Sequence, residues 1–170
     1  SGLNMSYQIL STEPQDILKI EAVKNYLRIS HDYDDLWLHD LIDGAICAAE
    51  NFLRTKLLCS IVQMSFDKIE NYAVKLSGSP IAEILEVTAN DECNFAYSIK
   101  DNVVRFDYIS GFKELRVKYI VGYKNQQDIP AYIRQALMLH VAEMYDNHGS
   151  VSVMSSEVQK LYQPYRKMSI

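Results

Sequence analysis

Apolar residues change their spacing twice along this chain, from helical to strictly alternating and back to helical. Apolar side chains three and four residues apart predict one helix within residues 18–29, a longer helix within 34–53 and a third within 130–147. From residue 61 onward, between the second and third helices, apolar positions alternate with polar ones. Alternation with a period of two predicts β-strands that have one buried face and one wet face.

Turn residues divide the alternating region into six predicted strands. Gly, Pro, Asn and Asp separate them, as at Ser77–Pro80, so strands that are neighbours in sequence are expected to pair antiparallel as a meander. The predicted strands cover residues 61–66, 72–76, 85–89, 95–99, 103–108 and 115–121. Two helices, a block of strands and a final helix follow the order of an α+β protein rather than that of alternating βαβ units.

The predicted fold class is therefore α+β, with a helical body made of two N-terminal helices and one long C-terminal helix. An antiparallel β meander is inserted at residues 61–121, and a short helical tail occupies residues 150–170. The length of 170 residues fits a single domain. Residues 1–16 are predicted to be flexible or in part a remnant of the expression sequence.

The composition is that of an acidic globular protein. Hydrophobic residues make up 48% of the chain and charged residues 23%, and the formal net charge is -5. No continuous apolar stretch approaches the length of a membrane span. Because an acidic chain has no global basic field to bind nucleic acid by counterion release, a dedicated DNA-binding protein is not expected.

The three cysteines, Cys47, Cys59 and Cys93, are odd in number and widely spaced. They lack the close pairing that zinc sites use, and they are predicted to be reduced, buried thiols. Reduced thiols indicate a cytoplasmic compartment.

Three polar groups have the residue types of a chemical site, and each has a simpler structural interpretation. His39 and Asp43 lie one helical turn apart, as metal ligands can, but no third ligand accompanies them at a definable spacing. The cluster Asp32–Asp35 lacks the glycine and the closing glutamate of a calcium loop and is interpreted as a helix start. His140 interrupts an apolar helical face without a nucleophile motif, so a neutral core histidine is expected. The sequence therefore predicts no catalytic, cofactor-binding or metal-binding residue.

The order of several segments resembles a known protein family. Residues 114–123 form a predicted strand that leads through Gly122 and Pro130 into the third helix. This run is similar to that of the small head-to-tail connector proteins of tailed bacteriophages and prophages, also called portal adaptor or head-completion proteins. The chain departs from the family pattern at Lys19, where a Ser or Thr helix cap is usual. Three other segments fit the family in the same order, namely residues 18–29, 34–52 and 161–166.

The resemblance implies a single connector domain over residues 1–170 that is a structural protein of the virion and not an enzyme. Such a protein assembles as a ring below the portal, with twelve copies expected to match it, and joins the DNA-filled head to the tail. Its expected partners are the portal protein, a tail-side completion protein and further copies of itself, while DNA passes through the channel without sequence-specific binding. No cofactor and no membrane association are implied, and the expected locations are the virion and, during assembly, the cytoplasm of the bacterial host.

The C-terminal tail carries the residues that are expected to bind a partner. Its helix is predicted to start after a cap at Ser155 or Ser156 and to end at Pro164. A tail this short packs either on its own domain or on a partner, and the resemblance favours the portal as that partner. Tyrosine, of which the chain has twelve, supplies a large contact area with a polar tip. The predicted partner-binding residues are Leu161, Tyr162, Tyr165 and Arg166.

Two alternatives remain open from the sequence. The chain could be another small phage structural protein, such as a stopper or tail-completion protein. It could also be an α+β domain that binds a small molecule or catalyses hydrolysis through a site that one sequence does not reveal.

Overall fold

The computed structural model describes residues 4–149 and 154–168. Residues 1–3 belong to the N-terminal stretch predicted to be flexible, and residues 150–153 belong to the predicted tail. Both stretches, together with residues 169–170, lie outside the described residues.

The chain divides into two compact units, each built from two separated stretches of sequence. The β unit combines the residues through Pro14 with Leu58–Lys124, and the helical unit combines Gln15–Leu57 with the residues from Asn125 onward. The inserted strands predicted at residues 61–121 all fall in the β unit. The prediction that residues 1–170 behave as one connector domain stays a prediction.

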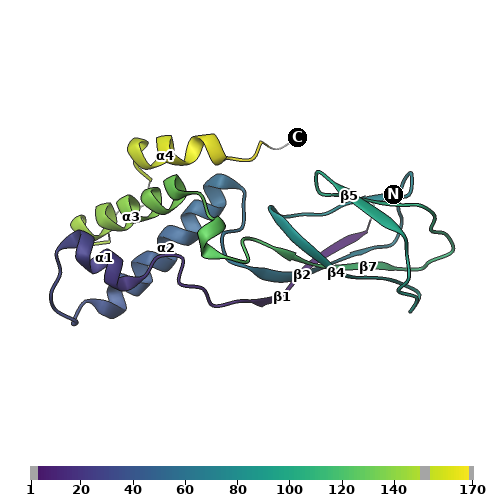
Figure 1. The fold of residues 1–170 in the computed structure, drawn as a ribbon, viewed down its shortest axis with the longest axis horizontal. Coiled ribbons are helices and arrows are strands. Elements are labelled where there is room, and N and C mark those ends of the chain that lie inside the picture. The colour runs from purple at the N-terminus through teal and green to yellow at the C-terminus, as the bar shows by residue number, and fades with distance from the viewer. Residues whose placement is uncertain (1–3, 150–153, 169–170) are drawn as a thin grey trace. The chain divides into compact units, whose positions relative to one another are not determined.

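The described part of the helical unit contains four α-helices, in the predicted order (Figure 1). The first two end at Arg28 and Arg54, which adopt the left-handed conformation that terminates helices. Lys19 precedes the first helix and makes no side-chain capping hydrogen bond, in line with the departure from the family pattern at this position. The helices are α1 (Ile20–Leu27), α2 (Asp35–Leu53), α3 (Ala131–Asp146) and α4 (Ser156–Tyr162).

Apolar faces of α2 and α3 form the core of the helical unit, as the spacing of their apolar residues predicts. These two helices pack on each other, and α4 packs along α3 (Figure 1). The buried face of α2 includes Leu38, Leu41, Ala45, Ala49 and Leu53, and that of α3 includes Ile133, Leu137, His140, Val141 and Met144.

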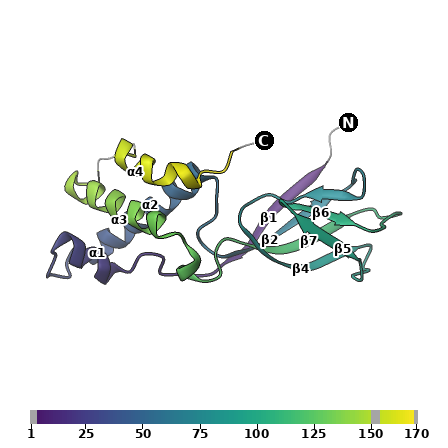
Figure 2. The same cartoon turned by 45° about the horizontal axis from the view of Figure 1, so that its top comes forward.

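The described part of the β unit contains seven strands in two antiparallel sheets. The four-stranded sheet has the order β1-β2-β7-β4, and the three-stranded sheet has the order β3-β6-β5 (Figure 2). The strands are β1 (Met5–Thr12), β2 (Ser60–Phe66), β3 (Ala73–Lys75), β4 (Ile81–Ala89), β5 (Tyr97–Lys100), β6 (Val103–Phe106) and β7 (Leu115–Val121).

The α+β class and the antiparallel pairing are confirmed, but the strand order differs from that of a simple meander. β7 lies between β2 and β4, and β6 lies between β3 and β5, so most neighbours in a sheet are distant in sequence. Core-facing side chains of the two sheets pack in one apolar cluster that includes Met64, Val104, Phe106 and Val117. The two sheets therefore form a small sandwich with its core between them.

The N-terminal segment is the main element that the sequence analysis missed. Residues 5–12, predicted to be flexible, form strand β1, which pairs with β2 from Met5↔Phe66 to Thr12↔Ser60. Met5, Tyr7 and Ile9 in fact alternate with polar residues, as strand residues do. The segment is ordered because β2 offers it an unpaired edge.

Gly122 closes the β unit next to the point where β7 ends. Its φ is +91°, and a Cβ atom at this position would lie 2.4 Å from the carbonyl oxygen of Leu58. The start of the β2 segment and the end of β7 therefore approach each other so closely that only glycine fits.

We expect Gly122→Ala to destabilise the protein by about 3 kcal/mol, because the change combines left-handed strain with a backbone clash. Gly111→Ala is the matched control, since Gly111 also has a positive φ of +69° but has no atom within 4 Å of the added Cβ. The control should lose only about 1 kcal/mol. Urea unfolding of both variants measures the difference, and equal losses would contradict the close approach at Leu58.

Candidate partner-binding surface

The C-terminal tail is built into the helical unit by its first turn. Ser155 is the N-cap of α4, and its Oγ accepts a hydrogen bond from the backbone N–H of Val158 at 3.2 Å. The same hydroxyl donates to the Glu143 carboxylate on α3 at 2.8 Å. This confirms the cap predicted at Ser155 or Ser156, and it ties the tail helix to α3.

The end of the tail packs on the end of α2. The ring of Tyr162 lies 6.1 Å from that of Phe52, and the Arg166 guanidinium lies 4.8 Å from the centroid of the same Phe52 ring, as a cation–π pair. The backbone N–H of Lys167 donates to the carbonyl of Leu53 at 2.9 Å. Three successive contacts therefore hold residues 162–167 against one helix end.

The burial of Tyr162 corrects one of the predicted partner-binding residues. Its side chain is fully buried, so Tyr162 contributes to the core of its own chain and not to a partner surface. Burial raises the pKa of its hydroxyl well above the usual range, and the hydroxyl has no hydrogen-bond partner among the described residues. The residues after Pro164 also do not project freely, because Gln163–Tyr165 form a turn of 3-10 helix.

The other three predicted residues keep part of their surface. Leu161 and Tyr165 are half-buried, and Arg166 is exposed. Their role in binding stays a prediction. The outer sides of these three residues are thus accessible to solvent, while the buried Tyr162 packs the tail on its own chain.

A groove of about 790 Å³ lies beside Leu161 on the helical unit. Apolar side chains of four segments, which the sequence analysis did not bring together, form most of it. Arg134 lines the groove while donating hydrogen bonds to the carbonyls of Gln126 and Ile129. The apolar lining includes Ile17, Leu18, Ala22, Met138, Leu139 and Leu161.

The aspartate cluster before α2 acts through ion pairs and not through a side-chain helix cap. Lys24 of α1 contacts Asp32 at 2.5 Å and Asp35 at 2.8 Å, and this contact lowers the pKa of Asp32. Asp34 is the N-cap residue without a side-chain capping bond, and it accepts a hydrogen bond from Tyr145 of α3 at 3.0 Å. The predicted helix start is confirmed, and its carboxylates tie α2 to both neighbouring helices.

The polar residues considered for chemistry do not assemble into a site. His39 and Asp43 are exposed on α2, and the described residues contain no group of three or more His, Cys, Asp or Glu side chains that could hold a metal ion. Cys59 is buried as predicted, whereas Cys47 and Cys93 are exposed, which corrects the expectation of three buried thiols.

His140 is a core residue, as predicted from its place in an apolar stripe. It is 4% exposed, and burial lowers its pKa. Its Nδ1 finds no hydrogen-bond partner among the described residues. A neutral, enclosed imidazole of this kind serves packing.

Among the described residues, no helix has both the length and the apolar character that a membrane crossing requires.

The comparison with protein families covers two of the segments that carry the sequence resemblance, residues 18–29 and 34–52, and ends at the start of the strand that leads into α3. The family described as "Phage gp6-like head-tail connector protein" matches residues 17–116, which is more than half of the chain. The chain belongs to this family. The connector therefore has a structural role at the junction of a phage head and tail. No curated protein matches it.

Solved structures share the fold of the connector over nearly its full length. A chain in "Neck of empty GTA particle computed with C6 symmetry" has a TM-score of 0.73 at 14% identity, with 97% of each chain covered. A chain in "Neck of native GTA particle computed with C12 symmetry" has a TM-score of 0.72 at 14% identity and the same coverage. A chain in "Virion of native gene transfer agent (GTA) particle" has a TM-score of 0.71 at 15% identity, with 96% of each chain covered. At these identities the likeness establishes the fold.

Two substitutions of Tyr162 separate the contribution of its ring to stability from that of its hydroxyl. Tyr162→Ala should destabilise the connector by about 3–5 kcal/mol because it leaves a cavity under the tail. Tyr162→Phe should be as stable as the wild type or more stable by about 1 kcal/mol, because it removes a buried hydroxyl that lacks a partner. Urea unfolding tests both, with the exposed Tyr132→Ala as the control. A marked loss in Tyr162→Phe would show that the hydroxyl makes a bond.

Lowering the pH should destabilise the connector through His140. Its pKa in the folded protein is lowered from the ordinary value of 6.5, so below that value the unfolded chain binds a proton that the folded chain resists. The stability conferred by the neutral imidazole is present above pH 6.5 and is lost as the pH falls through the folded-state pKa. His140→Gln should show a shallower fall of unfolding free energy between about pH 7 and about pH 5. The exposed His39→Gln should keep the wild-type slope, and equal slopes in all three proteins would exclude His140 as the cause.

Proposed function

We propose that this connector forms a ring below the portal and joins the DNA-filled head to the tail. The observation that carries the proposal is the family match over residues 17–116. The fold shared with chains of neck structures that have six-fold and twelve-fold symmetry supports a ring as the form of assembly. Twelve copies in the virion would match the portal.

Identical subunits close a ring when each one uses two different surfaces, one for each neighbour. Such contacts need not hold the ring together in free solution. The portal then acts as the template, and the connector completes its ring on it. A tail-side completion protein binds the opposite face of the finished ring.

The portal contact is proposed on the solvent-accessible sides of the half-buried Leu161 and Tyr165 and on the exposed Arg166. Tyrosine and arginine are enriched among residues that dominate binding energies. The tail is anchored on α2 and α3, so these side chains are held in place before a partner arrives. A preorganised contact loses less conformational entropy on binding than a free tail would.

The same assembly accounts for the acidic character of the chain and for the absence of predicted catalytic residues. With a net charge of -5, the connector has little attraction for the phosphate backbone, so DNA can move through the channel without being retained. The function is geometric and requires no reaction and no cofactor. The connector resides in the virion and, before that, in the host cytoplasm during assembly.

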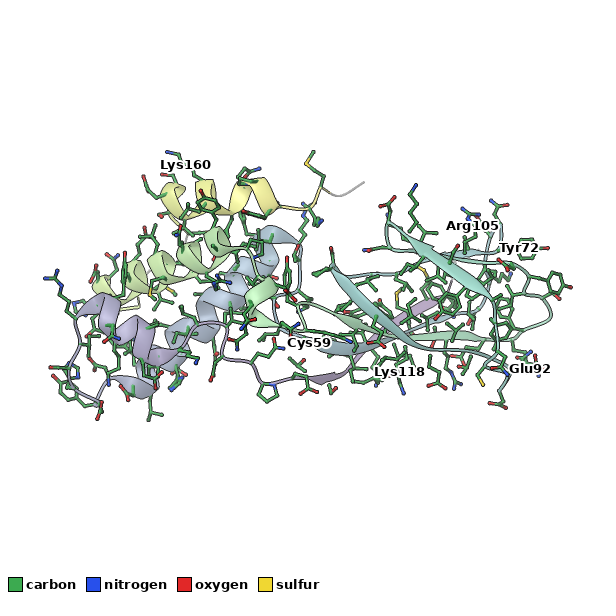
Figure 3. All side chains as sticks on the ribbon, in the orientation of Figure 1. Cys59, Tyr72, Glu92, Arg105, Lys118 and Lys160 are labelled. Carbon is green, nitrogen blue, oxygen red and sulfur yellow. The ribbon has the colours of Figure 1, made fainter. Side chains whose placement is uncertain are left out.

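Purified portal offers a direct test of the ring and of the tail contact. Negative-stain microscopy should show connector rings on portal particles. Tyr165→Ala/Arg166→Ala should weaken binding by roughly tenfold or more. The melting temperature should fall only slightly, because the intramolecular contact that is lost, between the exposed Arg166 and Phe52, contributes about 0.5–1 kcal/mol. Lys160→Ala is the control, because Lys160 is an exposed residue of the same tail, on α4, and points away from α3 (Figure 3).

Two outcomes would contradict parts of the proposal. A protein that neither binds portal nor forms rings on it would refute the connector ring. Rings that form normally with the doubly substituted tail would keep the ring and move the portal contact away from Tyr165 and Arg166.

A further inference from the structure

The core-facing side of β1 is left uncovered in the single chain. Met5, Tyr7 and Ile9 pair with Phe66, Met64 and Val62, whose side chains are buried in the sandwich core. They therefore point to the same side of the sheet, yet each is between 41% and 56% exposed. We call these three residues the β1 overhang. The strand contains no charged residue.

The second sheet has a matching uncovered strand. Tyr97 and Ile99 of β5 pair with Phe106 and Val104, which are buried in the core. Their side chains share that core-facing side but are 40% and 44% exposed. We call these two residues the β5 overhang.

The two overhangs lie on opposite sides of the sandwich. β1 and β4 are the two edges of the four-stranded sheet, and β5 lies on the β4 side in Figure 2. The chain path agrees, because the segment after β3 passes over Met64 of β2 and Tyr119 of β7 on its way to β4, with hydrogen bonds from Ser77 N to Met64 Sδ and from Tyr119 OH to Ser77 O. Each sheet thus extends past the other at one edge, in opposite directions.

We propose that the β5 overhang of one copy packs on the β1 overhang of the next copy, so that a sheet of each subunit overlaps a sheet of its neighbour in the ring. We call this contact the lap joint. The inference rests on the proposed ring and names the surfaces that build it. In the single chain, neither overhang is covered by the opposite sheet. In the ring, the β5 overhang of one copy covers the β1 overhang of the next copy, and the reverse is also true. Since the two surfaces differ, the contact is heterologous and repeats from copy to copy.

Charge at one end of the joint favours the same occupant. Asn102, next to the end of β5, donates to the carbonyl of Gly78, and Gly78 packs against Val121 at the end of β7. Val121 pairs with Ser60, which pairs with Thr12 at the end of β1. Lys100 and Glu13 therefore lie at the same end of the sandwich on opposite sides.

Both of these charged residues are exposed, and neither forms a salt bridge within the described chain. When one copy follows another side by side with its strands in the same direction, Lys100 of the first comes to Glu13 of the second. The joint thus combines an apolar contact with one complementary charge pair, which fixes its direction.

Single cysteines test the joint directly. In a Cys47→Ser/Cys93→Ser background, which keeps the buried Cys59, one protein carries Ile9→Cys and another carries Ile99→Cys. Mixed with purified portal, on which the ring is completed, and then oxidised, the two should form a 9–99 heterodimer at least tenfold faster than either forms a homodimer. Tyr132→Cys, exposed to a similar extent on α3, replaces either partner as the control. A charge swap adds a second measurement: Glu13→Lys or Lys100→Glu should slow cross-linking, and a mixture that pairs the two reversed charges should restore it.

Each outcome decides between distinct readings. Cross-linking no faster than with Tyr132→Cys would overturn the lap joint, and a dominant 9–9 or 99–99 homodimer would replace it by a two-fold contact. If cross-linking fails while rings still form on portal in the microscope, the proposed function stands and the subunit contact lies elsewhere. If cross-linking fails and no rings form on portal, the ring itself is refuted.

Discussion

The pairing of β2 with β7 is the constraint on which the rest of the chain depends. β2 follows α2 and β7 precedes α3, and their register pairs Ser60 with Val121 at the point where both strands meet the helical segments. Gly122 permits the backbones to close to contact at Leu58. An insertion of more than sixty residues thus begins and ends at one place. Because its ends coincide, α2 and α3 can pack on each other as they would with a short connection.

The tail illustrates how a short segment becomes part of a core. α4 has only seven residues, and a helix of that length is not stable alone. Its stability comes from Val158 and Tyr162, which are fully buried, and from the hydrogen bond between Ser155 and Glu143. A partner that binds the outer side of this helix would therefore contact a surface whose position α2 and α3 already determine.

Local pattern was sufficient to predict the helices and most of the strands, because each depends on apolar spacing within about ten residues. The order of strands was not predictable in this way, since β7 inserts between β2 and β4 through contacts that are distant in sequence. β1 was missed although Met5, Tyr7 and Ile9 alternate correctly, because a terminal strand forms only where another strand leaves an edge open. Tyr162 was assigned to a partner for a related reason, as sequence spacing does not show that Phe52 lies beneath it.

The two outer strands of the large sheet differ in a way that bears on assembly. β4 carries Glu83 and Glu86, ion-paired with Lys124 and Lys118, and its register shifts twice along β7. Lys118 projects from the face of β7 away from the second sheet (Figure 3). Charges and bulges of this kind keep an edge strand from pairing with a foreign strand.

β1 has one register shift and no charge, and it exposes its apolar face. A sheet whose β4 edge is protected and whose β1 edge is open favours addition of subunits in a single direction. If both edges were open, like edges could meet and the assembly would branch or aggregate. A ring requires the opposite, namely one donor surface and one acceptor surface per copy. In the proposed ring, the asymmetry of the sandwich supplies that pair of surfaces from the β unit alone, which combines the residues through Pro14 with Leu58–Lys124.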